Sequence, residues 1–170
     1  IYNPDGLSIR AVLDYVEKNR FLEGYPEGDA IGNAELLELP CDILAPSALQ
    51  NQITAENAAQ IQCKLLAEGA NGPTTLEADE ILRDRGVFVL PDVLGNAGGV
   101  TVSYFEWVQD IQNYVWTLEE INERLKKIMV NAFQRTLHRS QKDNMDMRTA
   151  AMIEGIQRVT QAKLLRGVFP

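Results

Sequence analysis

Three short apolar runs decide the fold: CDILA at 41–45, CKLLA at 63–67 and VFVL at 87–90. A strand with one wet face alternates apolar with polar residues, and none of these runs does so. Unbroken apolar runs of this length are typical of strands buried on both faces of a parallel sheet. The three runs therefore predict three buried, parallel strands.

Helical segments are expected between these runs. Thr54 is placed to cap AENAAQI at 55–61, and Thr75 is placed to cap a helix that begins at Leu76. Gly86 is well placed to end this second helix because glycine readily adopts a left-handed conformation. Alternating strands and helices predict the α/β class with a parallel, Rossmann-like sheet.

Apolar residues at helical spacing predict further helices on both sides of the sheet. The expected helices cover 8–20, with Ser8 as cap, then 33–39, 97–112, 117–140, with Thr117 as cap, and 146–165. We interpret residues 1–112 as a partial nucleotide-binding domain and residues 113–170 as C-terminal helices that pack on it. No internal repeat interrupts this organisation.

Composition restricts the class of protein and its partners. The chain has 170 residues, of which 45% are hydrophobic and 24% charged, and this is typical of a globular domain with a sizeable core. A net charge of −8 disfavours nucleic acid as a partner, because phosphate binding needs clustered Lys and Arg. No apolar run reaches the roughly 20 residues of a membrane helix. We expect a cytoplasmic protein, with the mitochondrial matrix as the alternative.

Polar residues follow each apolar run, where an open parallel sheet binds its ligands. Asn71 and Asn96 can each offer a donor and an acceptor to a carboxamide or a ribose hydroxyl. Gly98 and Gly99 lack a Cβ, so a flat ring can approach their backbone closely. Taken singly, such residues more often form turns. Their recurrence after successive strands favours a binding edge.

Val100 and Ser103 lie three residues apart and therefore share one face of the helix that follows the double glycine. They are placed to line a substrate pocket beside a nucleotide. For Ser103 an alternative stays open, because serine hydroxyls inside helices often bond back to a carbonyl one turn earlier.

The sequence indicates no metal centre. Cys41 and Cys63 lie in apolar runs without C-x-x-C or His partners, which favours a packing role. His138 stands alone, so neither a Ser-His nor a Cys-His catalytic pair can be assigned. The glycine fingerprint G-x-G-x-x-G is absent, because GNAGGV at 95–100 has a different spacing.

Four segments resemble the glutamate dehydrogenases of the glutamate, leucine, phenylalanine and valine dehydrogenase superfamily. These segments are CDILAPSALQNQIT at 41–54, LLAEGANGPTTLEAD at 65–79, PDVLGNAGGVTVSYFEW at 91–107 and RTAAMIEGIQRV at 148–159. The resemblance extends over essentially the whole chain. It implies the C-terminal part of the nucleotide-binding domain, with the first β-α-β unit of the sheet missing.

The resemblance also implies a reaction and a set of ligands. The reaction is L-glutamate, water and NAD or NADP giving 2-oxoglutarate, ammonia and the reduced coenzyme. By motif position, Ala48, Asn71 and Asn96 look like residues that line the nicotinamide and its ribose. Ser103 is similar to the hydroxyl that binds the side-chain carboxylate of the substrate, and Val100 to its neighbour in that pocket.

No catalytic residue is assigned, because the catalytic Lys and Asp of the family are expected in a missing N-terminal domain. We therefore expect a fragment that is inactive by itself, from a parent that the resemblance implies to be a homo-oligomer, usually a hexamer. The start at Ile1, without Met, favours a cleaved or truncated product. The alternative is a non-catalytic binding or oligomerisation module derived from this fold.

Overall fold

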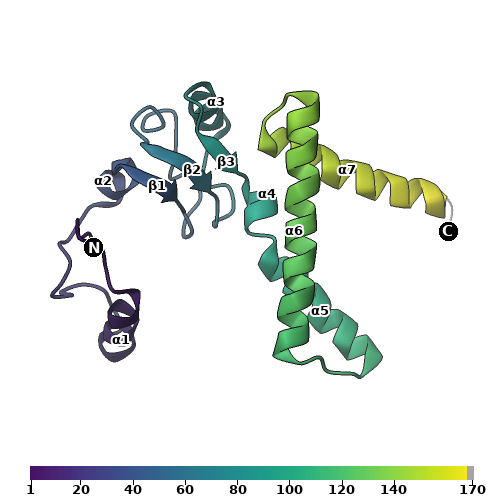
Figure 1. Ribbon diagram of the computed structural model, residues 1–170, viewed down its shortest axis with the longest axis horizontal. Helices are drawn as coiled ribbons and strands as arrows, with labels where there is room; N and C mark the ends of the chain where they lie inside the picture. The colour runs from purple at the N-terminus through teal and green to yellow at the C-terminus, as the bar shows by residue number, and fades with distance from the viewer. Residues whose placement is uncertain (168–170) are drawn as a thin grey trace.

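The computed structural model describes residues 1–167 and shows a parallel sheet followed by a helical region (Figure 1). Strands β1 (Cys41–Leu44), β2 (Cys63–Ala67) and β3 (Phe88–Leu90) lie in the order β1-β2-β3. Each strand is parallel to its neighbour. The α/β class, the parallel sheet and the C-terminal helices are therefore confirmed.

The strands are less buried than the apolar runs predict. In the central strand β2 the side chain of Leu66 is fully buried, but Ile43 of β1 is 63% exposed and Phe88 of β3 is 36% exposed. Both pair in register with Leu65 of β2. Because β1 and β3 are the edges of this sheet, the prediction of three buried strands is wrong for these two.

The hydrophobic core gathers around β2. Its buried members come from the strand, from the turns between β1 and β2, and from helices α2 (Asn33–Glu38) and α3 (Leu76–Asp84). They are Leu37, Ile53, Ala58, Ile61, Cys63, Leu66, Ala78 and Leu82. Cys41 packs against this cluster, so both cysteines serve as core residues, as the sequence predicts.

Helix α3 begins and ends as predicted. The Thr75 hydroxyl accepts a hydrogen bond from the Ala78 N–H at 3.3 Å, and the helix is followed by Gly86 with φ of +76°. This φ lies in the left-handed region that favours glycine. The crossover from β2 to β3 is thus fixed by local signals.

The helix predicted over 55–61 is wrong, since the structure has consecutive turns there. Asn57 explains the difference. Its side-chain oxygen accepts from the Thr54 N–H at 2.8 Å, and its side-chain nitrogen donates to the Gln52 carbonyl at 2.9 Å. An asparagine that bonds nearby backbone groups in this way stabilises a turn in competition with a helix.

The remaining helices match their predicted ranges. They are α1 (Ile9–Asn19), α2, α5 (Gly98–Gln112), α6 (Leu118–Asp143) and α7 (Met147–Arg166), and a short unpredicted helix, α4 (Asp92–Gly95), follows β3. Thr117 and Glu120 form a reciprocal capping box at the start of α6. Residues 168–170 of the predicted C-terminal segment lie outside the described residues.

The helices α5, α6 and α7 form a group beside the sheet, and α4 connects the two parts (Figure 1). Contacts join α6 to both α5 and α7, and the N-terminal part of α7 reaches β3 and α4. Helix α1 lies at the opposite end of the molecule and contains no buried residue. Within residues 1–167, no helix has the length and apolar character needed to cross a membrane.

We predict that replacing Leu66 by Ala in the 170-residue chain lowers the free energy of unfolding by about 2–5 kcal/mol, because it opens a cavity in the core. The matched change Ile43→Ala at the exposed edge is expected to cost less than about 1 kcal/mol. Urea unfolding followed by circular dichroism measures both. Equal losses would contradict the placement of the core at β2.

Candidate functional site

The loops after β1 and β2 pack directly on one another at the carboxyl end of the sheet. The N–H groups of Gly69 and Ala70 donate to the Pro46 carbonyl at 3.0 and 2.9 Å. A Cβ added to Gly69 would lie 2.5 Å from the Ser47 hydroxyl oxygen, closer than real contacts allow. Any larger residue at position 69 would therefore displace the Ser47 side chain, so glycine lets the two loops approach closely.

Two of the predicted coenzyme residues touch each other. The Asn96 side-chain nitrogen donates to the Asn71 side-chain oxygen at 2.7 Å and to the Ala70 carbonyl at 3.2 Å. Asn71 follows β2, whereas Asn96 ends α4 after β3. The structure thus brings together two amides that lie 25 residues apart in sequence. We call Asn71 and Asn96 the amide pair.

The amide pair retains hydrogen-bonding capacity towards solvent. The Asn71 side chain is exposed, and within residues 1–167 its NH₂ group donates to no other group. An amide of this kind can still bind a carbonyl or hydroxyl oxygen of a ligand.

The other predicted site residues lie on exposed surface. Ala48 is exposed in the loop after β1, and Val100 (70% exposed) and Ser103 lie in the first two turns of α5. No hydrogen bond joins Ser103 to the amide pair in the described part of the chain. The sequence left open a hydrogen bond from the Ser103 hydroxyl to a carbonyl one turn earlier. In the structure Thr101 makes a bond of this kind, since its hydroxyl donates to the Ala97 carbonyl at 2.8 Å.

Gly98 and Gly99 open α5 beside the amide pair. A Cβ added at either position meets no atom within 4 Å, and neither residue has a positive φ. The packing and the backbone conformation of this chain therefore do not require glycine at either position. Ala97, which precedes them, provides no side-chain cap for the helix. The first turn of α5 is therefore left without a side-chain cap.

A partly buried ion cluster that sequence reasoning missed lies at the end of the sheet, with Glu68 as its fully buried member. Glu68 follows β2 with its side chain fully buried, and Arg148 of α7 binds it through two hydrogen bonds of 2.7 and 3.0 Å. Arg148 also binds Asp79 of α3 at 2.9 and 3.2 Å and Asp92 of α4 at 3.3 Å. One guanidinium therefore joins three elements at the end of the sheet.

The charge state of Arg148 follows from its contacts. Burial acts to lower the pKa of Arg148, but the hydrogen bonds and charges of Glu68 and Asp79 outweigh this effect and raise the pKa. Arg148 therefore stays protonated, and the bidentate geometry suits a planar guanidinium. Glu68 and Arg148 lie 80 residues apart. No local spacing rule could have paired them.

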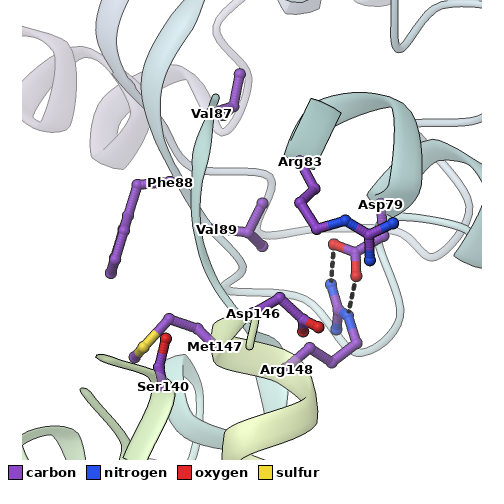
Figure 2. Close-up of a pocket in the computed structure, with 9 residues that line it drawn as sticks. All are labelled: Asp79, Arg83, Val87, Phe88, Val89, Ser140, Asp146, Met147 and Arg148. Atoms are coloured by element: carbon purple, nitrogen blue, oxygen red, sulfur yellow. Dashed lines mark hydrogen bonds and ion pairs between the residues drawn. The ribbon is translucent and has the colours of Figure 1, made fainter. Parts of the chain in front are cut away.

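A cavity of about 140 Å³ lies near this cluster, between β3, α3 and the start of α7 (Figure 2). Val87, Phe88 and Val89 form its apolar wall, and Figure 2 shows the Asp79–Arg148 pair at one side. None of the predicted coenzyme or substrate residues lines it. Across residues 1–167, no group of three or more His, Cys, Asp or Glu side chains is arranged to hold a metal ion.

Parallel strands with converging carboxyl-terminal loops define the class of open α/β domains that bind ligands at this edge. Comparison with known proteins refines this class. The chain belongs to the Glutamate/Leucine/Phenylalanine/Valine dehydrogenase family, whose sequence profile matches residues 1–167.

Individual relatives agree with this assignment. The catabolic NAD-specific glutamate dehydrogenase of Bacillus subtilis is 48% identical over 167 residues, covering 98% of this chain and 39% of the relative. The NADP-specific glutamate dehydrogenase of Synechocystis is 45% identical over 176 residues, covering 98% of this chain and 41% of the relative.

Solved structures agree as well. The hetero-hexameric glutamate dehydrogenase of Thermus thermophilus, in its leucine-bound form, superposes with a TM-score of 0.89 at 31% identity. That match covers 100% of this chain and 40% of the other. The chain thus spans about 40% of the length of the proteins that it matches.

We predict that Arg148→Met lowers the free energy of unfolding by about 3–5 kcal/mol, because it leaves the buried Glu68 carboxylate without its cation. The double variant Glu68→Gln with Arg148→Met removes that charge and is expected to recover part of the loss. Urea unfolding at neutral pH measures both variants. A loss below about 1 kcal/mol for Arg148→Met would contradict the buried ion pair.

A second prediction concerns Asp146, which caps α7 beside Arg148. Burial acts to raise its pKa, but hydrogen bonds from the Thr149 N–H and hydroxyl, both at 2.8 Å, outweigh burial and lower the pKa. The ionised Asp146 therefore stabilises the fold fully when the pH is above the pKa of an unfolded Asp, about 3.9. This stabilisation is lost as the pH falls through the lower pKa that Asp146 has in the folded protein.

The variant Asp146→Asn retains a capping side chain without the charge. Wild type is expected to be more stable than this variant at pH 7, and the difference should vanish at acidic pH. Thermal unfolding over a pH series measures it. A difference that is independent of pH would contradict the assigned cap.

Proposed function

We propose that these residues form part of an NAD- or NADP-dependent glutamate dehydrogenase, which converts L-glutamate and water to 2-oxoglutarate and ammonia. The observation that carries the proposal is the amide pair at the carboxyl end of a parallel sheet, in a chain of this family. The names of the relatives support the substrate and leave both coenzymes open, since one is NAD-specific and the other NADP-specific.

The residues fit a nicotinamide coenzyme. The exposed Asn71 amide can bind the carboxamide or ribose hydroxyls, and Asn96 holds it in place through the bond of 2.7 Å. Gly98 and Gly99 leave open space that a flat ring can enter. Ala48, exposed on the neighbouring loop, completes the proposed wall. When bound, the nicotinamide accepts a hydride from the substrate.

Substrate binding is assigned to the exposed face of α5. Within residues 1–167 the exposed Ser103 hydroxyl makes no hydrogen bond, so it can donate to the distal carboxylate of glutamate. Val100 provides an apolar contact one turn before it. A carboxylate withdrawn from water without such partners would be unfavourable.

No described residue is assigned to proton transfer, so we propose that the catalytic acid and base are supplied from outside these residues and that the isolated chain is inactive. We further propose that the complete enzyme is a cytoplasmic homo-oligomer. The relative from Thermus thermophilus, a hetero-hexamer, supports an oligomeric assembly.

Glutamate-dependent reduction of NAD and NADP, followed by absorbance, tests the proposal. Activity is expected in the full-length gene product and absent in the 170-residue chain. Activity in neither would favour a non-catalytic module, and activity in the isolated chain would show that its own residues transfer the protons.

We predict that Ser103→Ala in the full-length enzyme lowers kcat/KM for glutamate about tenfold or more, because a hydrogen bond to a charged group is lost. Ser103→Thr, which keeps the hydroxyl, is the matched control and should retain more activity. Unchanged glutamate turnover in Ser103→Ala, with turnover of leucine, valine or phenylalanine, would assign the enzyme to another branch of the family.

A further inference from the structure

We infer that Arg148 is a positioning residue for the coenzyme, because it holds Glu68 and Asp92 and thereby fixes the amide pair. This inference rests on the proposed function of Asn71 and Asn96. It assigns a role in coenzyme binding to helix α7, which carries none of the predicted site residues.

The guanidinium of Arg148 is saturated with hydrogen bonds. Arginine has five N–H donors, and Arg148 makes five hydrogen bonds to three carboxylates: two to Glu68, two to Asp79 and one to Asp92. Its side chain is 20% exposed, and that of Glu68 is 0% exposed. A side chain held by five bonds has a single orientation. The place of α7 therefore determines where the carboxylates that Arg148 binds lie at the strand ends.

Asp92 is a junction between Arg148 and the loop after β2. One carboxylate oxygen of Asp92 accepts from Arg148, and the other accepts from the Gly72 N–H at 2.8 Å. The Asp92 N–H in turn donates to a Glu68 carboxylate oxygen at 2.8 Å. Asp92 therefore ties the loop after β2 to the start of α4.

Asp92 and its partners also contact the residues of the amide pair. Asn71 is the residue directly before Gly72, and Asn96 lies one helical turn after Asp92, with its N–H donating to the Asp92 carbonyl at 3.0 Å. Gly95 packs against the Glu68 carbonyl so closely that a Cβ would lie 3.0 Å from that oxygen. Both asparagines are thus positioned by groups that Arg148 holds.

The position of the pair matters for binding because Asn71 lies on an exposed loop, next to a glycine with φ of +55°. The bond from Gly72 to Asp92 acts together with the bonds from Gly69 and Ala70 to the Pro46 carbonyl and from the Asn51 N–H to the Gly72 carbonyl. Its loss would lower the population of the loop conformation that binds the coenzyme. Lysine at position 148 would keep the charge but offer three donors from a single atom, so it could not reproduce the pattern.

The full-length enzyme tests this inference with a matched pair of variants, Arg148→Lys and Arg139→Lys. Arg139 of α6 binds Glu154 and Gln157 of α7 together with Asp143, and its side chain is 26% exposed. Among residues 1–167, no bond joins Arg139 to the strand ends. Asp92→Asn is a third variant, which weakens the same junction without changing α7.

Two measurements separate positioning from stability. Equilibrium titration with NADH and NADPH, followed by fluorescence, gives coenzyme affinity without turnover, and steady-state kinetics gives the KM of the coenzyme and of glutamate. We expect Arg148→Lys and Asp92→Asn to weaken coenzyme binding about tenfold or more, with the KM of glutamate changed less than about threefold. Arg139→Lys is expected to leave coenzyme affinity within about threefold of wild type.

Either of two results would overturn the inference. The first is wild-type coenzyme affinity in folded Arg148→Lys or in Asp92→Asn. The second is an equal loss of affinity in Arg139→Lys, which would show a general effect of α7 packing. Failure of the proposed function is distinguishable, since the wild-type enzyme itself would then neither bind NADH or NADPH nor oxidise glutamate.

Discussion

The buried carboxylate of Glu68 is the constraint on which the arrangement of the molecule depends. It lies directly after the central strand, where the chain leaves the core, and a charge withdrawn from water needs a partner. That partner comes from α7, so one ion pair fixes the helical region on the sheet. The same pair recruits Asp79 and Asp92, which places α3, α4 and α7 around one guanidinium.

Much of this fold could be predicted because its signals are local. Thr75 and Gly86 delimit one helix, and Thr117 and Asp146 cap the start of two others. The loops after the strands lie close together because parallel strands all end at the same side of the sheet. The predicted helix over 55–61 failed for an equally local reason, because the Asn57 side chain takes the backbone bonds of a turn. The spacing of apolar residues contains no information on whether a side chain will hydrogen-bond the backbone and so favour a turn over a helix.

The candidate site was predictable only in part. The contact between Asn71 and Asn96 follows from topology, since both residues follow strands that are neighbours in the sheet. The pairing of Glu68 with Arg148 could not be predicted from topology in this way, because the two residues lie 80 positions apart and no sequence pattern encodes their contact. Val100 and Ser103 lie on an exposed helix face, so the packing of these residues does not fix what they contact.

The two glycines at the start of α5 occupy positions where the fold itself does not require glycine. Most glycines whose role is structural have either a positive φ or a neighbouring atom in the way, as at Gly86 and Gly69. Gly98 and Gly99 have neither, so alanine there leaves the chain's own packing intact. Substitution at these two sites therefore examines the proposed coenzyme contact separately from folding, because a loss of affinity at unchanged stability would come from what approaches the chain from outside.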